Sequence, residues 1–73
     1  MLSQTELCSL VNMGASVVVD AKKMSALNIR QLLSFAKSKN GMVEIVNASH
    51  LSYLEIRLLA TIAPLNVKFN FVD

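Results

Sequence analysis

The sequence has few of the residues on which small stapled or metal-bound domains depend. One cysteine, Cys8, and one histidine, His50, stand among 73 residues. This excludes an internal disulfide framework and a cysteine-rich zinc site. Two glycines cannot make a phosphate-binding or dinucleotide-binding glycine loop. A hydrophobic fraction of 53% excludes a disordered tail.

Charged residues are also scarce, at 16%, and a net charge of +2 identifies no partner. A chain of 73 residues holds one domain, which we place at residues 1–73. Its longest apolar stretch, residues 51–67, is interrupted by Glu55, Arg57 and Pro64, and is shorter than the ~20 residues that cross a bilayer. Residues 1–6 lack the basic start and apolar run of a secretory signal. We expect a soluble, cytoplasmic protein that does not bind membranes.

An internal repeat relates two parts of the chain at an offset of 27 residues. Residues 20–36 align with residues 47–63, and the strand-like ends at 18–20 and 45–47 return at 71–73. The identical pairs are Ala21 and Ala48, Ser25 and Ser52, Leu27 and Leu54, Ile29 and Ile56, Arg30 and Arg57, Leu32 and Leu59, and Ala36 and Ala63. Self-similarity at a fixed period indicates a repeat architecture. The predicted units are residues 1–20, 21–47 and 48–73.

Helix starts recur in each unit. Ser3 with Glu6 and Ser52 with Glu55 form the pattern of a capping box, and Ser25 begins a weaker version. The predicted order is therefore helix, strand, helix, strand, helix, strand. The expected helices are 3–13, 25–39 and 52–63, and the expected strands are 16–20, 42–47 and 67–72.

Helix ends follow from the scarce glycines and proline. Gly14 and Gly41 suit the left-handed conformation after the first two helices, and Pro64 ends the third. The connections are then short, and right-handed crossovers give a parallel three-stranded sheet in the order 1-2-3.

Alternation along the strands predicts two different sheet faces. The expected helix-covered face carries Val18, Val43, Ile45, Phe69 and Phe71. The other face mixes apolar and charged residues and is expected to stay open as an interaction face, comprising Val17, Val19, Glu44, Val46, Lys68, Asn70 and Val72. All helices then lie on one side of the sheet, as in a solenoid.

The 27-residue unit resembles the longer leucine-rich repeats in architecture, because Val17, Val19 and Met24 have the spacing of their strand segment. Asp-Ala or Asn-Ala after a strand, followed by Ser-x-Leu-x-Ile-Arg, is also similar to a short βα-repeat of bacterial proteins of unassigned function. Residues 17–20, 32–41 and 42–49 run like the central strand, helix and strand of the anti-sigma-factor-antagonist (STAS) fold, without its Asp-Ser phosphorylation motif. These resemblances imply a fold and no particular activity.

No set of residues indicates catalysis. His50 occupies a predicted surface loop, and Glu44 is expected to pair with Lys68 across the sheet. Asp20, Asn47 and Asp73 follow strands. A ligand site at the carboxyl edge of the sheet is one interpretation, and the favoured one is that these short polar side chains bind loop amides. We therefore expect no enzyme activity, no cofactor and no metal.

Two functions follow from the surfaces. The favoured function is a non-catalytic protein-interaction module that self-associates as a dimer, using the open sheet face and the edge strand, because repeat arrays need several units and the edge segment 16–19 carries no charge, proline or bulge. A contact through the third helix, with Tyr53 and Leu54, is the alternative way for two copies to meet. The protein partner beyond a second copy is not specified. The alternative is a nucleic-acid-binding or regulatory protein that uses a basic segment, residues 22–39, which is otherwise a solvated helix face. Its cations are Lys22, Lys23, Arg30, Lys37 and Lys39.

Overall fold

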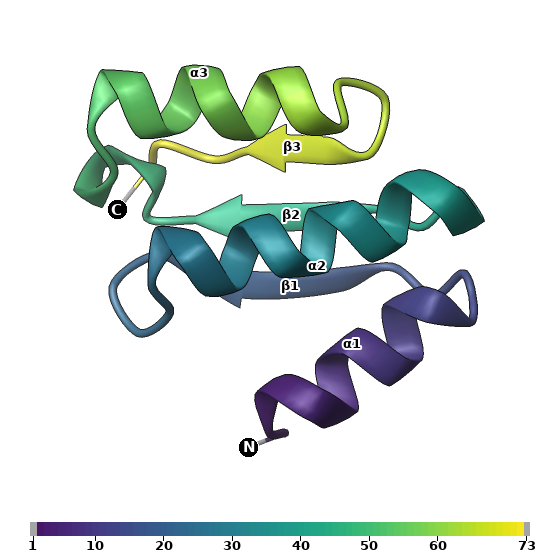
Figure 1. The fold of residues 1–73 in the computed structure, drawn as a ribbon. Coiled ribbons are helices and arrows are strands. Elements are labelled where there is room, and N and C mark those ends of the chain that lie inside the picture. The colour runs from purple at the N-terminus through teal and green to yellow at the C-terminus, as the bar shows by residue number, and fades with distance from the viewer. Residues whose placement is uncertain (1, 73) are drawn as a thin grey trace.

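The computed structural model describes residues 2–72 and contains the predicted alternation of helices and strands. The elements are α1 (Gln4–Asn12), β1 (Val17–Asp20), α2 (Ala26–Lys39), β2 (Val43–Val46), α3 (Tyr53–Ile62) and β3 (Val67–Phe69), with a short 3-10 helix, η1 (Ala48–His50), before α3. The sheet is parallel with strand order β1-β2-β3, as predicted. In Figure 1, α2 crosses in front of the sheet, α3 lies beside β3, and α1 lies beyond β1.

One hydrophobic core joins the helices to one face of the sheet. The apolar stripe of α2 is fully buried, as predicted, because α2 lies between the other two helices. The buried residues are Val11, Val19, Ile29, Leu32, Leu33, Ala36, Val43, Ile45, Ala48, Leu51, Leu59 and Ala63. The opposite sheet face carries Val18, Glu44 and Lys68, and no helix within residues 2–72 covers it.

The prediction for the faces of β1 is wrong. Val17 pairs with Val43 and Val19 with Ile45, so both valines face the helices, and Val19 is only 5% exposed. Val18, expected in the core, is 63% exposed on the open face. Three successive valines carry no alternation that fixes the phase, and a shift of one residue exchanges every side chain between faces.

The last strand is shorter than predicted. It ends at Phe69, although the Asn70 amide still donates to the Ile45 carbonyl (2.8 Å), and beyond it the Val72 amide donates to Asn70 Oδ1 (3.0 Å). Phe71, expected on the helix-covered face, is 53% exposed and stacks on the Phe69 ring at 6.2 Å between centroids. The expected row of Val19, Val46 and Val72 across the open face does not exist.

The helix starts match the prediction. Ser3 Oγ accepts the Glu6 amide (3.2 Å) and Glu6 Oε1 accepts the Ser3 amide (2.9 Å). Ser52 and Glu55 make the same capping box. These bonds satisfy backbone amides that have no partner inside the helix.

Gly41 does not take the left-handed conformation that was predicted for it after α2. Gly14 has a φ of 91°, as expected after α1, but the left-handed residue after α2 is Asn40, with a φ of 61°. Gly41 is buried where a Cβ would lie 2.8 Å from the Ala15 carbonyl oxygen. Glycine is therefore required at 41 by the close approach of two chain segments.

Candidate interaction site

The free edge of β1 presents unpaired backbone groups. The Val17 amide donates to the Met42 carbonyl (2.8 Å) and the Ala21 amide to the Val46 carbonyl (3.0 Å), so these residues point at β2. Because successive strand residues point to opposite edges, the Val18 amide and carbonyl point away from β2. They have no hydrogen-bond partner within residues 2–72.

A cavity of about 350 Å³ lies beside this edge. It lies between the beginning of α1 and β1, and its lining is mainly apolar, with one acidic and one basic residue. The lining residues are Leu2, Leu7, Val18, Val19, Asp20, Lys23 and Met24. A groove of this kind next to unpaired strand groups can accept the alternating side chains of an added strand.

The position of α1 accounts for this cavity. The helices α2 and α3 each connect two neighbouring strands, whereas α1 precedes β1 and lies beyond its free edge (Figure 1). Gln4 Nε2 holds α1 to α2 by donating to the Asn28 carbonyl and to Gln31 Oε1, both at 3.0 Å. One side of α1 therefore packs on α2, and the other side has no strand next to it.

The carboxyl ends of β1 and β2 are joined by a repeat-related pair. Asn47 Nδ2 donates to Asp20 Oδ1 (2.9 Å), which also accepts the Lys22 amide (2.8 Å). These two bonds, the Asn47 bond first, lower the pKa of the Asp20 carboxyl below its ordinary value. The predicted structural role of Asp20 is confirmed, and the pair fixes the end of β1 that borders the cavity.

The residues predicted to form the open face are only partly brought together. Glu44, Val46 and Lys68 share this face, whereas Val17 and Val19 lie on the helix side and Asn70 and Val72 follow the end of β3. Glu44 and Lys68 are register partners, as predicted, but form no ion pair in the described structure.

Sequence reasoning missed Val18 as an open-face residue, and with it Leu2, Leu7 and Met24 beside the edge. Asp20 was the available signal. Asp20 lies two residues after Val18 and therefore on the same face of the strand. Because a carboxylate is not buried without partners, both residues belong to the open face.

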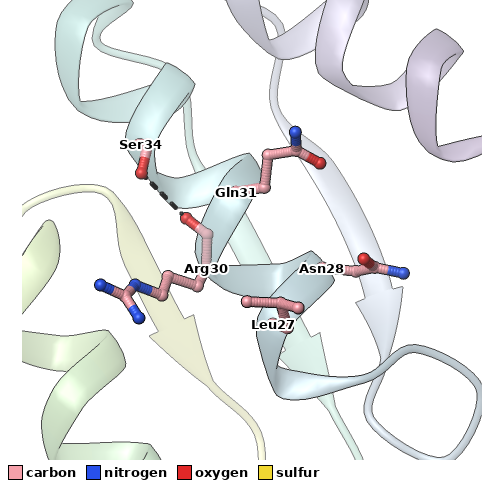
Figure 2. A pocket seen from close by; sticks show the side chains of 5 residues that line it. All are labelled: Leu27, Asn28, Arg30, Gln31 and Ser34. Carbon is pink, nitrogen blue, oxygen red and sulfur yellow. Dashed lines mark hydrogen bonds between the residues drawn. The ribbon is translucent and has the colours of Figure 1, made fainter.

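The outer surface of α2 holds a second, shallow pocket (Figure 2). Figure 2 shows Arg30 pointing toward α3 and Gln31 toward α1, with Ser34 Oγ donating to the Arg30 carbonyl (3.1 Å). The same surface carries Leu27, 72% exposed, and Leu54 of α3 is 73% exposed. Leu27 also borders a small pocket that it shares with Glu55, Leu58 and Leu59 of α3.

The basic segment is spread over a long surface. Lys22 and Lys23 lie in the loop after β1, and the other three cations follow α2 to its last turn. A helix of 14 residues is about 21 Å long, and all five side chains are exposed. The cations therefore form a stripe beside α2, with Lys23 alone reaching the β1 cavity.

Cys8 and the carboxylates carry no site of their own. Burial raises the pKa of the Cys8 thiol, and Gln4 Nε2 lies 3.6 Å from its sulfur. Within residues 2–72, no group of three His, Cys, Asp or Glu side chains is arranged to hold a metal ion. No helix in the described range has the length and apolar character needed to cross a membrane.

Comparisons of the chain with protein-family models, with curated proteins and with solved structures find no match.

Proposed function

We propose that this chain is a non-catalytic protein-interaction module that self-associates through the free edge of β1. The observation that carries the proposal is Val18. Its backbone amide and carbonyl are unpaired at the edge, and its side chain is 63% exposed. An edge strand with free backbone groups, an exposed valine and no lysine or proline is a template for pairing with another chain.

The cavity beside β1 supports strand addition over a contact through side chains alone. Main-chain hydrogen bonds to Val18 would supply affinity, and the apolar walls from Leu2, Leu7 and Met24 would receive alternate side chains. A chain of 73 residues buries only about 60% of its unfolded surface. Covering this edge with a second copy removes further apolar surface from water, and a dimer is the smallest assembly that does so.

The basic segment supports nucleic-acid binding less well. Its cations extend along α2, and within residues 2–72 none of them is recorded over an aromatic ring. The recorded cation–ring contact, Arg57 with Tyr53 at 5.8 Å, is on α3. Binding through phosphate contacts alone would give retention on DNA or RNA that falls steeply with salt. Retention of this kind, with a wild-type chain that sediments as a monomer, would favour the alternative function.

Sedimentation of wild type and two lysine variants tests the proposal. Val18→Lys places a charge at the edge strand, and Val46→Lys places the same charge on the same open face of β2, whose two edges are both paired. We expect wild type and Val46→Lys to associate at micromolar concentration and Val18→Lys to sediment at 8.0 kDa.

Any other outcome of the sedimentation experiment contradicts one part of the proposal. A folded wild-type monomer contradicts self-association. An assembly that Val46→Lys dissociates and Val18→Lys does not places the contact on the open face. Circular dichroism of both variants confirms that they fold, which is expected because Val18 is exposed and Val46 half-buried.

A further inference from the structure

We infer that the strand added to β1 is β3 of a second copy, parallel and head to tail. This inference rests on the proposed function and specifies its partner strand. It assigns the empty place beside α1 to residues 67–69 of another copy, so that the two copies form one continuous six-stranded sheet with all helices on one side.

The backbone groups at the two free edges are complementary. In both internal strand pairs, the backbone amide and carbonyl groups of the helix-face residues point toward the next strand along the chain. The Val17 amide donates to the Met42 carbonyl, and the Val43 amide donates to the Asn66 carbonyl, each at 2.8 Å. The backbone groups of the open-face residues point toward the preceding strand. The free edge of β3 therefore exposes groups of Val67 and Phe69, and the free edge of β1 exposes those of Val18. The same combination, helix-face residues of one strand with open-face residues of the next, pairs β1 with β2.

The order of elements is complementary as well. Within residues 2–72, α1 has a strand after it and none before it, whereas β3 has α3 before it and no neighbour on its other edge. When β3 of one copy lies against β1 of the next, α1 stands between two strands, as α2 and α3 already do. The groove lined by Leu2 and Leu7 is then the inner surface of a regular βα array.

Charge favours this pairing over the pairing of two β3 strands. On the open face, Lys68 of the added strand would lie beside Val18 and within reach of Asp20, since cross-strand neighbours and their diagonals interact. Two β3 strands would instead bring Lys68 next to Lys68, and like charges directly opposite are destabilising. Lys68 is exposed and forms no ion pair in the described structure, so it is available for Asp20.

Head-to-tail pairing does not stop at two copies, whereas an isologous dimer does. Each added copy presents a new β3 edge, so the assembly continues as a filament or closes as a ring. The mass of wild type is therefore expected to increase with concentration beyond two copies, which is a further readout of the same contact.

Disulfide cross-linking tests the direction of the contact. All variants carry Cys8→Ala, so that introduced thiols are the sole ones. The chains are Val18→Cys, Lys68→Cys, Ser16→Cys, which covers a register shifted by two residues, and Val46→Cys as a control for collisions. Neighbouring residues of paired strands are close enough for a disulfide, which needs Cα atoms about 4.4–6.8 Å apart.

Under brief oxidation, we expect Lys68→Cys mixed with Val18→Cys or Ser16→Cys to form linked dimers about tenfold or more faster than Lys68→Cys mixed with Val46→Cys, because association raises the effective concentration. Val18→Cys alone is expected to link no faster than the control. Rapid linking of Val18→Cys alone, or an associated chain in which neither mixture links, overturns the head-to-tail contact and leaves self-association standing. A wild-type monomer without any linking overturns the proposed function itself.

Discussion

The two free edges of this sheet differ in how they meet solvent. The edge strand β1 has four residues, an exposed valine on its open face and an apolar cavity beside it. The edge strand β3 has three residues, and its open-face residue is the exposed Lys68. Short length and lysine are the devices by which proteins prevent edge pairing. β3 therefore carries a lysine that opposes pairing with a second β3, whereas β1 carries an exposed valine at the corresponding position.

Different contacts hold the first residues of β1 and of β3 in place. The start of β1 lies against Gly41, where a Cβ would be 2.8 Å from the Ala15 carbonyl oxygen, whereas at the start of β3 Asn66 Nδ2 donates to the Gly41 carbonyl (2.8 Å). Gly41→Ala is expected to lower the free energy of unfolding by about 1–3 kcal/mol, since backbone atoms must shift. Asn66→Ala is expected to lower it by about 1 kcal/mol.

Urea unfolding of the two variants measures this difference. If Gly41→Ala costs less than Asn66→Ala, the close approach of Ala15 and Gly41 does not fix β1 against β2.

The caps of α1 and α3 should affect the two edges differently. Ser3→Ala and Ser52→Ala each remove an N-cap and should each lower stability by about 1 kcal/mol. Only Ser3→Ala frays the first turn of α1, which borders the β1 cavity. Thermal unfolding and sedimentation, compared for both variants, should show weaker association for Ser3→Ala alone. Equal loss of association in both would separate α1 from the contact.

Removing the charge on Lys68 tests whether this residue lies opposite Val18 in the assembly. In a chain that carries Val18→Lys, the head-to-tail contact places two lysines side by side, and like charges directly opposite each other are destabilising. The further change Lys68→Val removes this repulsion and should restore association, which sedimentation of the double variant measures. A double variant that stays monomeric contradicts the pairing of Val18 with Lys68.

The smallest expected effect concerns the acid that borders the cavity. The Asn47 and Lys22 bonds lower the pKa of Asp20, so the stability they provide is present above the ordinary aspartate pKa and is lost as the pH falls through the lowered value. An NMR titration of the Asp20 carboxyl should show a midpoint below the ordinary value, and Asn47→Ala should move it upward. An unmoved midpoint excludes the Asn47 bond as the main cause.

Local signals predicted the elements and their order correctly. Ser3, Ser52 and the α2 stripe have spacings that only a helix satisfies, and short connections leave one simple parallel topology. The phase of β1 could not be read from Val17, Val18 and Val19, because the three are chemically identical. The Val72 bond to the Asn70 side chain beyond β3 has no signal in the strand pattern, and Gly41 is required by a contact with a distant segment.

The candidate site was harder to predict than the fold. Its cavity joins Leu2 and Leu7 of the first unit to Met24 of the second, and no periodicity within one element connects them. Sequence reasoning expected an edge strand at residues 16–19, and β1 is an edge of the sheet, although the residue that faces outward is Val18 and not Val17.

Amide hydrogen exchange at Val18, followed as the chain concentration increases, tests the central claim most directly. The Val18 amide is free at the edge of one copy and hydrogen-bonded in the proposed assembly. Its exchange should slow with concentration, while the Lys22 amide, already bonded to Asp20 at 2.8 Å, should change little. A Val18 amide that exchanges at one rate over a concentration range in which the sedimenting mass rises would contradict association through β1.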